Sequence, residues 1–392
     1  MPRLLTLGAT LTLVAAACGG GGSSTAPTAA PTAAASQPAA SAPASQAASG
    51  PQAWTPDPTK LAAAKTEGGL TTIALPPSWC NYQDLLKGYT DKTGIAINNL
   101  NPDGSSQQEL DAITQNKDNK GPAAPDVVDV GLSYGPQGVA QGLFAKYQVA
   151  SWADIPDTAK DKDGYWYGDY YGVMAFEINK AVITSNEPAD WADLLKQPKN
   201  SVALAGDPTG SNQAVSAVWA AGLGAGGDLT TGAQKGLDFF KQLNDAGIFV
   251  SAIGKTATVA SGLTPIRLAW TYNALADKDS LAGNPEIDVV VPKTGRLGGM
   301  YVQAISAYAP HPNAAQLWMD WLYSDEGQNL WLKGYCNPIR YDAMVKANAV
   351  PADLAAKLPD SSGAQLPTLD QITAANGVIT KGWPTTVGVT VK

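Results

Sequence analysis

The stretch LTTIALPPSWCNYQDLLKGYTDKTGIAI (residues 70–97) contains the pattern that decides the fold. LTTIAL (70–75) is a short β-rich run, and NYQDLLKGYTDKTG (81–94) places Leu85, Leu86 and Tyr89 on one helical face before Gly94 ends the helix. IAI (95–97) is a second strand. A strand, a helix and a strand in this order predict an α/β domain with a largely parallel sheet.

The same alternation continues along the rest of the chain. Further strands are predicted at DVVDVG (126–131), GVMAFEIN (172–179), SVALA (201–205), IRLAW (266–270) and IDVVV (287–291), and helices at 211–224, 236–247 and 314–335. No low-complexity linker separates the two α/β units, so we expect two lobes that face each other. Ligands of such folds bind in the gap at the carboxyl ends of the strands.

One glycine-rich segment matches a nucleotide-binding motif in the spacing of its glycines but not in its structural context. GLGAGG (222–227) fits G-x-G-x-x-G, but a dinucleotide site needs these glycines between a strand and a helix. Here they follow a predicted helix. We therefore interpret the segment as a helix end and loop.

The amino terminus has the composition of an exported and anchored protein. Residues 1–17 combine Arg3, an apolar run and small residues, which is typical of a signal peptide. Cys18 then stands as in a bacterial lipobox, although Ala15 replaces the usual leucine; an ordinary secretory signal is the alternative. Residues 19–50 consist mainly of Gly, Ser, Ala, Pro and Thr, so we expect residues 18–65 to form a disordered tether.

Composition excludes several classes of function. The net charge of −8, with 15% charged residues and no long run of one sign, argues against nucleic-acid binding. The single histidine, His311, lies between two prolines and is expected in a solvated turn, so Ser-His-Asp catalysis and histidine-rich metal sites are not predicted. Outside the cytoplasm, Cys80 and Cys336 favour a disulfide over two free thiols, but the sequence does not show whether they meet.

Five segments also occur in a recognisable order: LLKGYTDKTGIAI, PDVVDVGLSYG, IRLAWTYNALA, the long run from IDVVVPKTG to GQNLW, and GYCNPIR. In this order, the chain from about residue 68 to 388 resembles ABC-transporter solute-binding proteins of the branch that binds polyamines, ferric iron, thiamine and phosphonates. The resemblance implies a hinged, two-lobed, periplasmic-binding-protein-like (type II) fold. It implies lobe one from 66–170 plus 272–312 and lobe two from 171–271 plus 313–392, with IRLAWTYNALA as a strand that crosses between them.

The resemblance also implies a function. Such a protein is a monomer that binds a small molecule without catalysing a reaction, needs no cofactor, and delivers its ligand to a permease in the membrane. Together with Cys18, it implies a protein anchored by lipid to the outer face of the cell membrane.

The resemblance implies a set of candidate ligand contacts, which are hydroxyl, aromatic and amide side chains at positions that border the cleft in the family. They are Ser78, Trp79, Ser133, Tyr134, Tyr170, Tyr171, Thr209, Ser211, Asn212, Trp270, Tyr272 and Tyr301. Trp79 is either a stacking surface or a core residue, and only one of Tyr170 and Tyr171 can face the ligand because neighbours on a strand alternate. Thr209 and Ser211 either help to bind an anion at a helix N-terminus or simply cap that helix.

The candidate residues favour a small organic anion or a polar neutral molecule. Tyr272 and Tyr301 stand where polyamine-binding members carry carboxylates, and a desolvated diamine needs such partners. Asn273 replaces the second of two tyrosines that are usual in ferric-iron members. Polyamine and ferric-iron binding remain alternatives, and a surface enzyme that uses Asp169 and Asp207 is the alternative of another class.

Overall fold

The computed structural model describes residues 50–392 of the chain. The predicted signal peptide, Cys18 and the tether up to residue 49 lie outside these residues. The predicted tether is too long at its other end, because α1 (Pro58–Glu67) already belongs to the folded part. The Asp57 side chain caps this helix, and the Glu67 carboxylate accepts hydrogen bonds from the backbone of Asn313 and Ala314.

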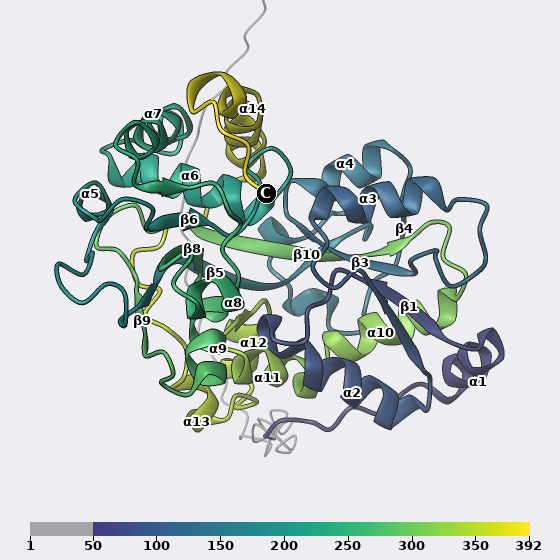
Figure 1. Ribbon diagram of the computed structural model, residues 1–392. Helices are drawn as coiled ribbons and strands as arrows, with labels where there is room; N and C mark the ends of the chain where they lie inside the picture. The colour runs from purple at the N-terminus through teal and green to yellow at the C-terminus, as the bar shows by residue number, and fades with distance from the viewer. Residues whose placement is uncertain (1–49) are drawn as a thin grey trace, which may run out of the picture. The chain divides into compact units, whose positions relative to one another are not determined.

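Most of the first lobe is built from the segment before the first crossing of the chain (Figure 1). After α1 its elements are β1 (Leu70–Ile73), the 3-10 turn η1 (Trp79–Asn81), α2 (Tyr82–Thr93), β2 (Ile97–Leu100), α3 (Ser106–Gln115), β3 (Val127–Gly131), α4 (Tyr134–Ala140), β4 (Phe144–Ala145) and the 3-10 turns η2 (Trp152–Asp154) and η3 (Asp157–Ala159). Gly94 ends α2 with a φ of 72°, as predicted from the sequence. The predicted strand at 95–97 starts two residues later than expected.

The second lobe follows the long strand β5 (Tyr167–Asn179). Its elements are α5 (Trp191–Leu194), β6 (Val202–Leu204), α6 (Asn212–Gly224), α7 (Gly232–Asp245), β7 (Phe249–Val250), α8 (Thr256–Ala260), β8 (Ile266–Trp270), α9 (Thr271–Leu281) and β9 (Ile287–Val290). The predicted strands and helices of this half are present with small shifts of their ends. GLGAGG (222–227) forms the end of α6 and the loop after it.

The last part of the chain returns to lobe one and then to lobe two. Its elements are β10 (Gly298–Ser306), α10 (Pro312–Leu322), α11 (Asp325–Lys333), β11 (Asn337–Pro338), α12 (Tyr341–Lys346), α13 (Ala352–Ala355) and α14 (Leu369–Thr386). The single helix predicted at 314–335 is therefore two helices, because the Ser324 side chain caps a new helix by accepting from the Gly327 amide.

The main sheet is mixed rather than largely parallel. In it, β6–β7 and β6–β8 are parallel pairs, whereas β10 is antiparallel to β3 and β5, and β5 is antiparallel to β8 and β9. β1 and β2 pair in parallel in a separate two-stranded sheet. The antiparallel pairs all involve β5 and β10, the two longest strands. β5 pairs with β10 up to Val173 and with β8 from Met174 onward, so the first crossing lies close to the expected boundary.

Two of the expected lobe boundaries, those at residues 271/272 and 312/313, are wrong. α10 packs on α1 and α2, and α11 packs on α2 and η1, so these helices belong to lobe one. Conversely, β9 pairs with the lobe-two half of β5, and α9 packs on both strands. The predicted crossing strand IRLAWTYNALA ends at Trp270, and α9 begins at the next residue. α14, which packs on α6 and α7, returns to lobe two, and so does Lys392, which exchanges backbone hydrogen bonds with Ser251 and Ile253.

The core fills both lobes and continues under the crossing strands. Its largest fully buried side chains are aromatic: Trp191, Trp270, Trp318, Trp321, Trp331, Trp383, Tyr82, Tyr89, Tyr167, Tyr170, Tyr272 and Tyr323. Within residues 50–392, no helix combines the length and the apolar character needed to cross a bilayer.

Candidate functional site

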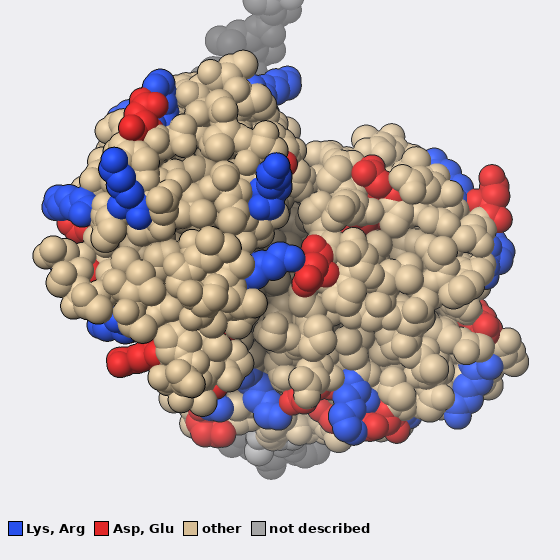
Figure 2. Space-filling model, in the orientation of Figure 1, with Lys and Arg blue, Asp and Glu red and all other residues tan. Residues whose placement is uncertain are grey.

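A cleft of about 600 Å³ lies between the two lobes. Lobe one contributes the loop after β1 and the segment from residue 102 to the first turn of α3. Lobe two contributes the β6–α6 loop, the start of α8, and side chains of β8 and α9. Figure 2 shows the molecular surface hollowed between the two halves of the folded part. The cleft has the volume of a site for a small molecule.

Two helix N-termini meet at the cleft from opposite lobes. Ser105 caps α3 in a capping box with Gln108, and Ser211 caps α6 by accepting from the Ala214 amide. The first N–H groups of a helix have no partner within the helix, so both ends can donate to a bound solute. Beside the α6 end, the Gln213 side chain donates to Asn273 at 2.8 Å.

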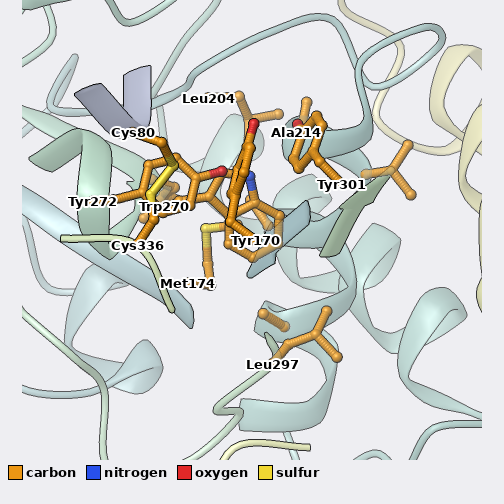
Figure 3. Packing of buried hydrophobic residues seen from close by; sticks show 14 of the residues in the cluster. Cys80, Tyr170, Met174, Leu204, Ala214, Trp270, Tyr272, Leu297, Tyr301 and Cys336 are labelled. Carbon is orange, nitrogen blue, oxygen red and sulfur yellow. A yellow bond between two sulfur atoms is a disulfide. The ribbon is translucent and has the colours of Figure 1, made fainter. Parts of the chain in front are cut away.

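Aromatic side chains form a wall at the base of the cleft, which we call the aromatic wall: Trp79, Tyr170, Tyr272 and Tyr301. The Trp79 ring lies 5.5 Å from the rings of both Tyr272 and Tyr301, and Tyr170 stacks on Tyr301 at 5.7 Å. Figure 3 shows Tyr272 beside the disulfide, with Tyr170 and Tyr301 farther from it. Only Trp79 and Tyr301 line the cleft, because Tyr170 and Tyr272 are fully buried behind them.

The disulfide joins Cys80 of η1 to Cys336, which lies between α11 and β11. The two Cα atoms are 5.5 Å apart, within the usual range for a disulfide. Of the two alternatives that the sequence left open, the structure has the paired form. The bond lies inside lobe one, since α11 packs on η1, and it fixes the residue that follows Trp79.

A network of buried acids lies next to the aromatic wall, and two of its members, Glu109 and Asp129, line the cleft. The Asp129 Oδ2 atom accepts hydrogen bonds from the hydroxyls of Tyr82 at 2.7 Å and Tyr170 at 2.8 Å. Glu109 accepts from the Asp129 amide, and Gln303 donates to Asp169 at 3.0 Å.

Burial dominates the ionisation of these acids. It raises the pKa of Asp129 to about 7. Burial, followed by the charge of Asp129, raises the pKa of both Glu109 and Asp169 well above the usual range. The apo cleft therefore has weakly acidic carboxyl groups at its base on the lobe-one side.

A second charged cluster lies on the lobe-two side. Arg267 of β8 places one terminal nitrogen 2.5 Å from both Glu177 and Asp277. Burial raises the pKa of Glu177 even though Arg267 opposes the shift. Arg267 and Asp277 line the cleft, and the cluster has one cation against two carboxyl groups.

The two lobes touch across the cleft at several points. The Tyr134 hydroxyl donates to the Gly210 carbonyl at 3.3 Å, and the Lys255 ammonium lies 3.7 Å from the Asp103 carboxylate. A Cβ atom at Gly131 would overlap the side chain of Asn212, so this position requires glycine in the closed arrangement. Such contacts hold the lobes closed around the cleft.

The structure brings together only part of the predicted contact set. Five residues line the cleft: Ser78, Trp79, Ser211, Asn212 and Tyr301. Tyr170 and Tyr272 form the buried back of the aromatic wall, and the fully buried Trp270 stacks on Tyr272. Tyr170 rather than Tyr171 faces the wall, because Tyr171 lies on the other side of β5 near Asn337.

The remaining predicted contacts have other partners. Ser133 accepts a hydrogen bond from Asn376 of α14, and Tyr134 makes the interlobe bond to Gly210. The exposed Thr209 hydroxyl donates to Asp207 at 2.7 Å. These three side chains do not line the cleft. In the sequence they occupy loop positions like those of the residues that do.

Most of the charged residues that line the cleft are not among the residues predicted from the sequence. Glu109 is on an amphipathic helix, where an acid is normally expected on the solvent face, and Arg267 is the single polar residue of IRLAW. Two signals were present: Ser105 and Gln108 have the spacing of a capping box, and Asp129 interrupts the apolar run of DVVDVG. His311 was also misplaced. Its ring Nδ1 lies 2.8 Å from Asp126, and it is only partly exposed.

Among residues 50–392, no three His, Cys, Asp or Glu side chains are grouped so that they could hold a metal ion. What the lining offers a solute is hydrogen-bond donors at two helix ends, an aromatic surface and several carboxyl groups.

Comparison with known proteins gives a family match and a shared fold. The family model described as bacterial extracellular solute-binding protein matches residues 124–364, which is more than half of the chain. No curated protein sequence matches the chain.

Solved structures share the fold at low sequence identity. AfuA from Actinobacillus pleuropneumoniae, with fructose-6-phosphate bound, is 20% identical with a TM-score of 0.62 over 81% of this chain and 98% of that one. Iron-bound HitA from Pseudomonas aeruginosa is 19% identical with a TM-score of 0.58 over 80% and 99%. AgtB from A. tumefaciens R10, with agropinic acid, is 16% identical with a TM-score of 0.62 over 82% and 99%. This likeness shows the two-lobed type II periplasmic-binding fold.

Proposed function

Because the chain belongs to the family of bacterial extracellular solute-binding proteins, we propose that it is the binding component of an ABC importer and holds a small organic solute in its interlobe cleft. The observation that carries this proposal is the cleft itself, which lies between lobes connected by the crossing strand β5. Structural neighbours crystallised with a sugar phosphate, an opine and iron support a role in carrying solutes.

The geometry suggests how binding and release are coupled. An open form exposes the two helix ends and the aromatic wall, and a solute that contacts both lobes favours the closed form. The bonds from Tyr134 to Gly210 and from Lys255 to Asp103 form only when the lobes approach. A permease that separates the lobes breaks these contacts and lowers the affinity for the solute.

A protein with this role needs no catalytic group, and we propose that the chain acts as a monomer without enzymatic activity. Asp169 and Asp207, the acids considered for an enzyme, do not come together at a reacting position. Asp169 is fully buried behind the aromatic wall, whereas Asp207 accepts from Thr209 in the β6–α6 loop.

The direct test is a binding screen on the full chain purified in detergent. Calorimetry and thermal unfolding should be measured with sugars, sugar phosphates, amino acids, amines, organic acids and ferric citrate. At least one solute should bind saturably and raise the melting temperature as its concentration increases. Chemical conversion of a bound solute, or no binding to any member of the panel, would contradict the proposal.

We further propose that Cys18 carries lipid and that the protein is anchored on the outer face of the membrane. Anchoring keeps a binding protein at a high local concentration near its permease. The Cys18→Ser variant should appear in the soluble fraction, with solute affinity unchanged. A variant that stays in the membrane fraction would argue against lipidation, and lost affinity would show that this segment contributes to the site.

A further inference from the structure

The lobe-one side of the cleft contains two buried carboxyl groups without a cation. Glu109 is 1% exposed and Asp129 is 5% exposed, and both line the cleft. Neither forms an ion pair within residues 50–392. Burying an ionised carboxyl group is costly unless a positive charge or several hydrogen bonds compensate for the lost hydration.

Asp129 has an unused hydrogen-bonding atom. Its Oδ2 atom accepts from two tyrosine hydroxyls, but its buried Oδ1 atom has no partner among the described residues. A buried acceptor that lacks a donor is rare in a folded protein, because leaving it unpaired costs free energy. A proton shared with the neighbouring Asp169 carboxyl, which forms a side-chain hydrogen bond with Asp129, or a donor supplied by a bound solute would satisfy it.

The surroundings of Asp129 fit a positively charged donor. Trp79 and Tyr301 line the cleft, and the Tyr170 hydroxyl connects this wall to Asp129. Trp79 in turn donates from its indole nitrogen to Tyr170 at 2.6 Å. Aromatic faces next to carboxyl groups form an environment that attracts an organic cation by charge and by cation–π interaction.

The opposite side of the cleft has less need of a charged partner. Arg267 already pairs with Glu177 and Asp277, so its positive charge is neutralised within the protein. Lys255 lies near Asp103 at the exposed edge. The acids that line the cleft outnumber the bases; they are Asp103, Glu109, Asp129, Asp207 and Asp277, against Lys255 and Arg267.

From this arrangement we infer that the cleft selects solutes that carry a protonated amino group, with Asp129 and Glu109 as the counter-charges of that group. This inference rests on the proposed function and specifies its solute class. It differs from the sequence-based expectation of an anion or neutral molecule, which was made before these carboxyl groups were placed in the cleft. The remaining polar groups of the solute then face the N-termini of α3 and α6.

The test uses pairs of compounds in which an amino group is replaced by a hydroxyl. Suitable pairs are phosphoethanolamine with ethylene glycol monophosphate, glucosamine with glucose, and putrescine with 1,4-butanediol; citrate and fructose-6-phosphate serve as anions. Affinities for the full chain are measured by calorimetry at pH 7. At least one amino compound should bind about 30-fold or more tightly than its hydroxyl partner, as expected for a buried charge pair.

Variants connect that preference to the named residues. Asp129→Asn and Glu109→Gln should each weaken binding of the preferred amino compound about 10-fold or more and leave the weak binding of its hydroxyl partner nearly unchanged. Asp91→Asn, which changes an acid paired with Lys87 on the exposed face of α2, is the matched control and should bind like the parent. Since Asp129 bonds to Tyr82 and Tyr170, Glu109→Gln provides the second variant if Asp129→Asn folds poorly.

Proton release gives an independent measurement. An ammonium group beside Asp129 and Glu109 lowers the pKa of both carboxyl groups. It acts against burial, which raises both pKa values, and in the same direction as the hydrogen bonds that Asp129 forms with Tyr82, Tyr170 and Asp169. Calorimetry of the amino compound in buffers of different ionisation enthalpy should therefore show about half a proton or more released at pH 7. Selective binding of anions or hydroxyl compounds would overturn the inference and support the proposed function. A panel without any binding would contradict both.

Discussion

Cys80 and Cys336 are 256 positions apart in sequence, yet their Cα atoms lie 5.5 Å apart and a disulfide joins them. The bond fastens η1, which carries Trp79, to the segment that follows α11. Gly334 packs against the backbone of Cys80 and Asn81 so closely that a Cβ atom would not fit there. The cleft wall is thus attached to the part of lobe one that comes from the far end of the sequence.

Removing this cross-link should lower both stability and affinity. We expect the double variant Cys80→Ser/Cys336→Ser to lose about 2–5 kcal/mol in the free energy of unfolding, as is typical for a native disulfide that closes a long loop. Solute affinity should fall as well, because Trp79 loses its fixed neighbour. Denaturant unfolding and calorimetry with and without reductant measure both effects.

The double variant is also the control for the reductant. Reductant should lower the stability and the solute affinity of the parent protein and change neither in the double variant. A parent protein that keeps its stability and affinity after full reduction would show that packing around Gly334 holds η1 without the bond.

Trp79 should contribute to binding through its ring and to the wall through its indole nitrogen. Trp79→Ala should weaken solute binding about 10-fold or more, because it removes an aromatic face from the cleft. Trp79→Phe should weaken solute binding less, by on the order of 1 kcal/mol in binding free energy, because mainly the hydrogen bond to Tyr170 is lost. Trp152→Phe, at a half-buried tryptophan outside the cleft, is the control. Equal affinities for all three variants would place the solute elsewhere.

Many helices and strands could be predicted because local sequence patterns indicate where they begin and end. The end of α2 at Gly94 and the buried strand at 127–131 follow from periodicity and turn residues alone. The lobe assignment of α10 could not be predicted in this way. Its apolar stripe shows that one face is buried, but not that the partner is α1 and α2, more than 200 residues earlier.

The site was harder to predict than the fold for a similar reason. The loop pattern correctly indicated that Trp79 and Ser211 reach the cleft. Tyr272 was placed on a strand, but α9 begins at Thr271, so its ring turns behind Trp79. Glu109 has the sequence context of a solvent-exposed helix residue, and only the packing of α3 over β3 brings it to the cleft.

Removing the Arg267 side chain should destabilise the protein strongly. Arg267→Met leaves Glu177 and Asp277 buried without their cation, and breaking a buried ion pair in this way costs about 3–5 kcal/mol. The triple variant Arg267→Met/Glu177→Gln/Asp277→Asn should recover part of that loss, because no uncompensated charge remains.

Denaturant unfolding of both variants measures the difference. Lys241→Met, which removes one partner of an exposed pair with Asp245, should change the stability by less than about 1 kcal/mol and serves as the control. If the single Arg267 variant unfolds like the parent, the three charges do not depend on one another.

The buried acid Asp129 predicts an unusual dependence of stability on pH. Its pKa is raised to about 7 in the folded protein, so the folded state binds a proton that the unfolded state has released above about pH 4. Its contribution to stability is therefore fully present at low pH and falls as pH rises, by about 1.4 kcal/mol per unit up to pH 7. Above pH 7 no further loss comes from this residue.

Replacing Asp129 should remove its contribution to the pH dependence of the free energy of unfolding. Between pH 5 and 7 the apo parent should lose about 2–3 kcal/mol through Asp129, and Asp129→Asn should show a correspondingly smaller decrease in the free energy of unfolding. Asp84 is the control, because its hydrogen bond with Lys333 lowers its pKa and confines its effect to lower pH. Asp84→Asn should therefore keep the slope of the parent between pH 5 and 7. An Asp129→Asn curve parallel to the parent over this range would mean that Asp129 is ionised in the apo protein, with compensation from solvent in the cleft.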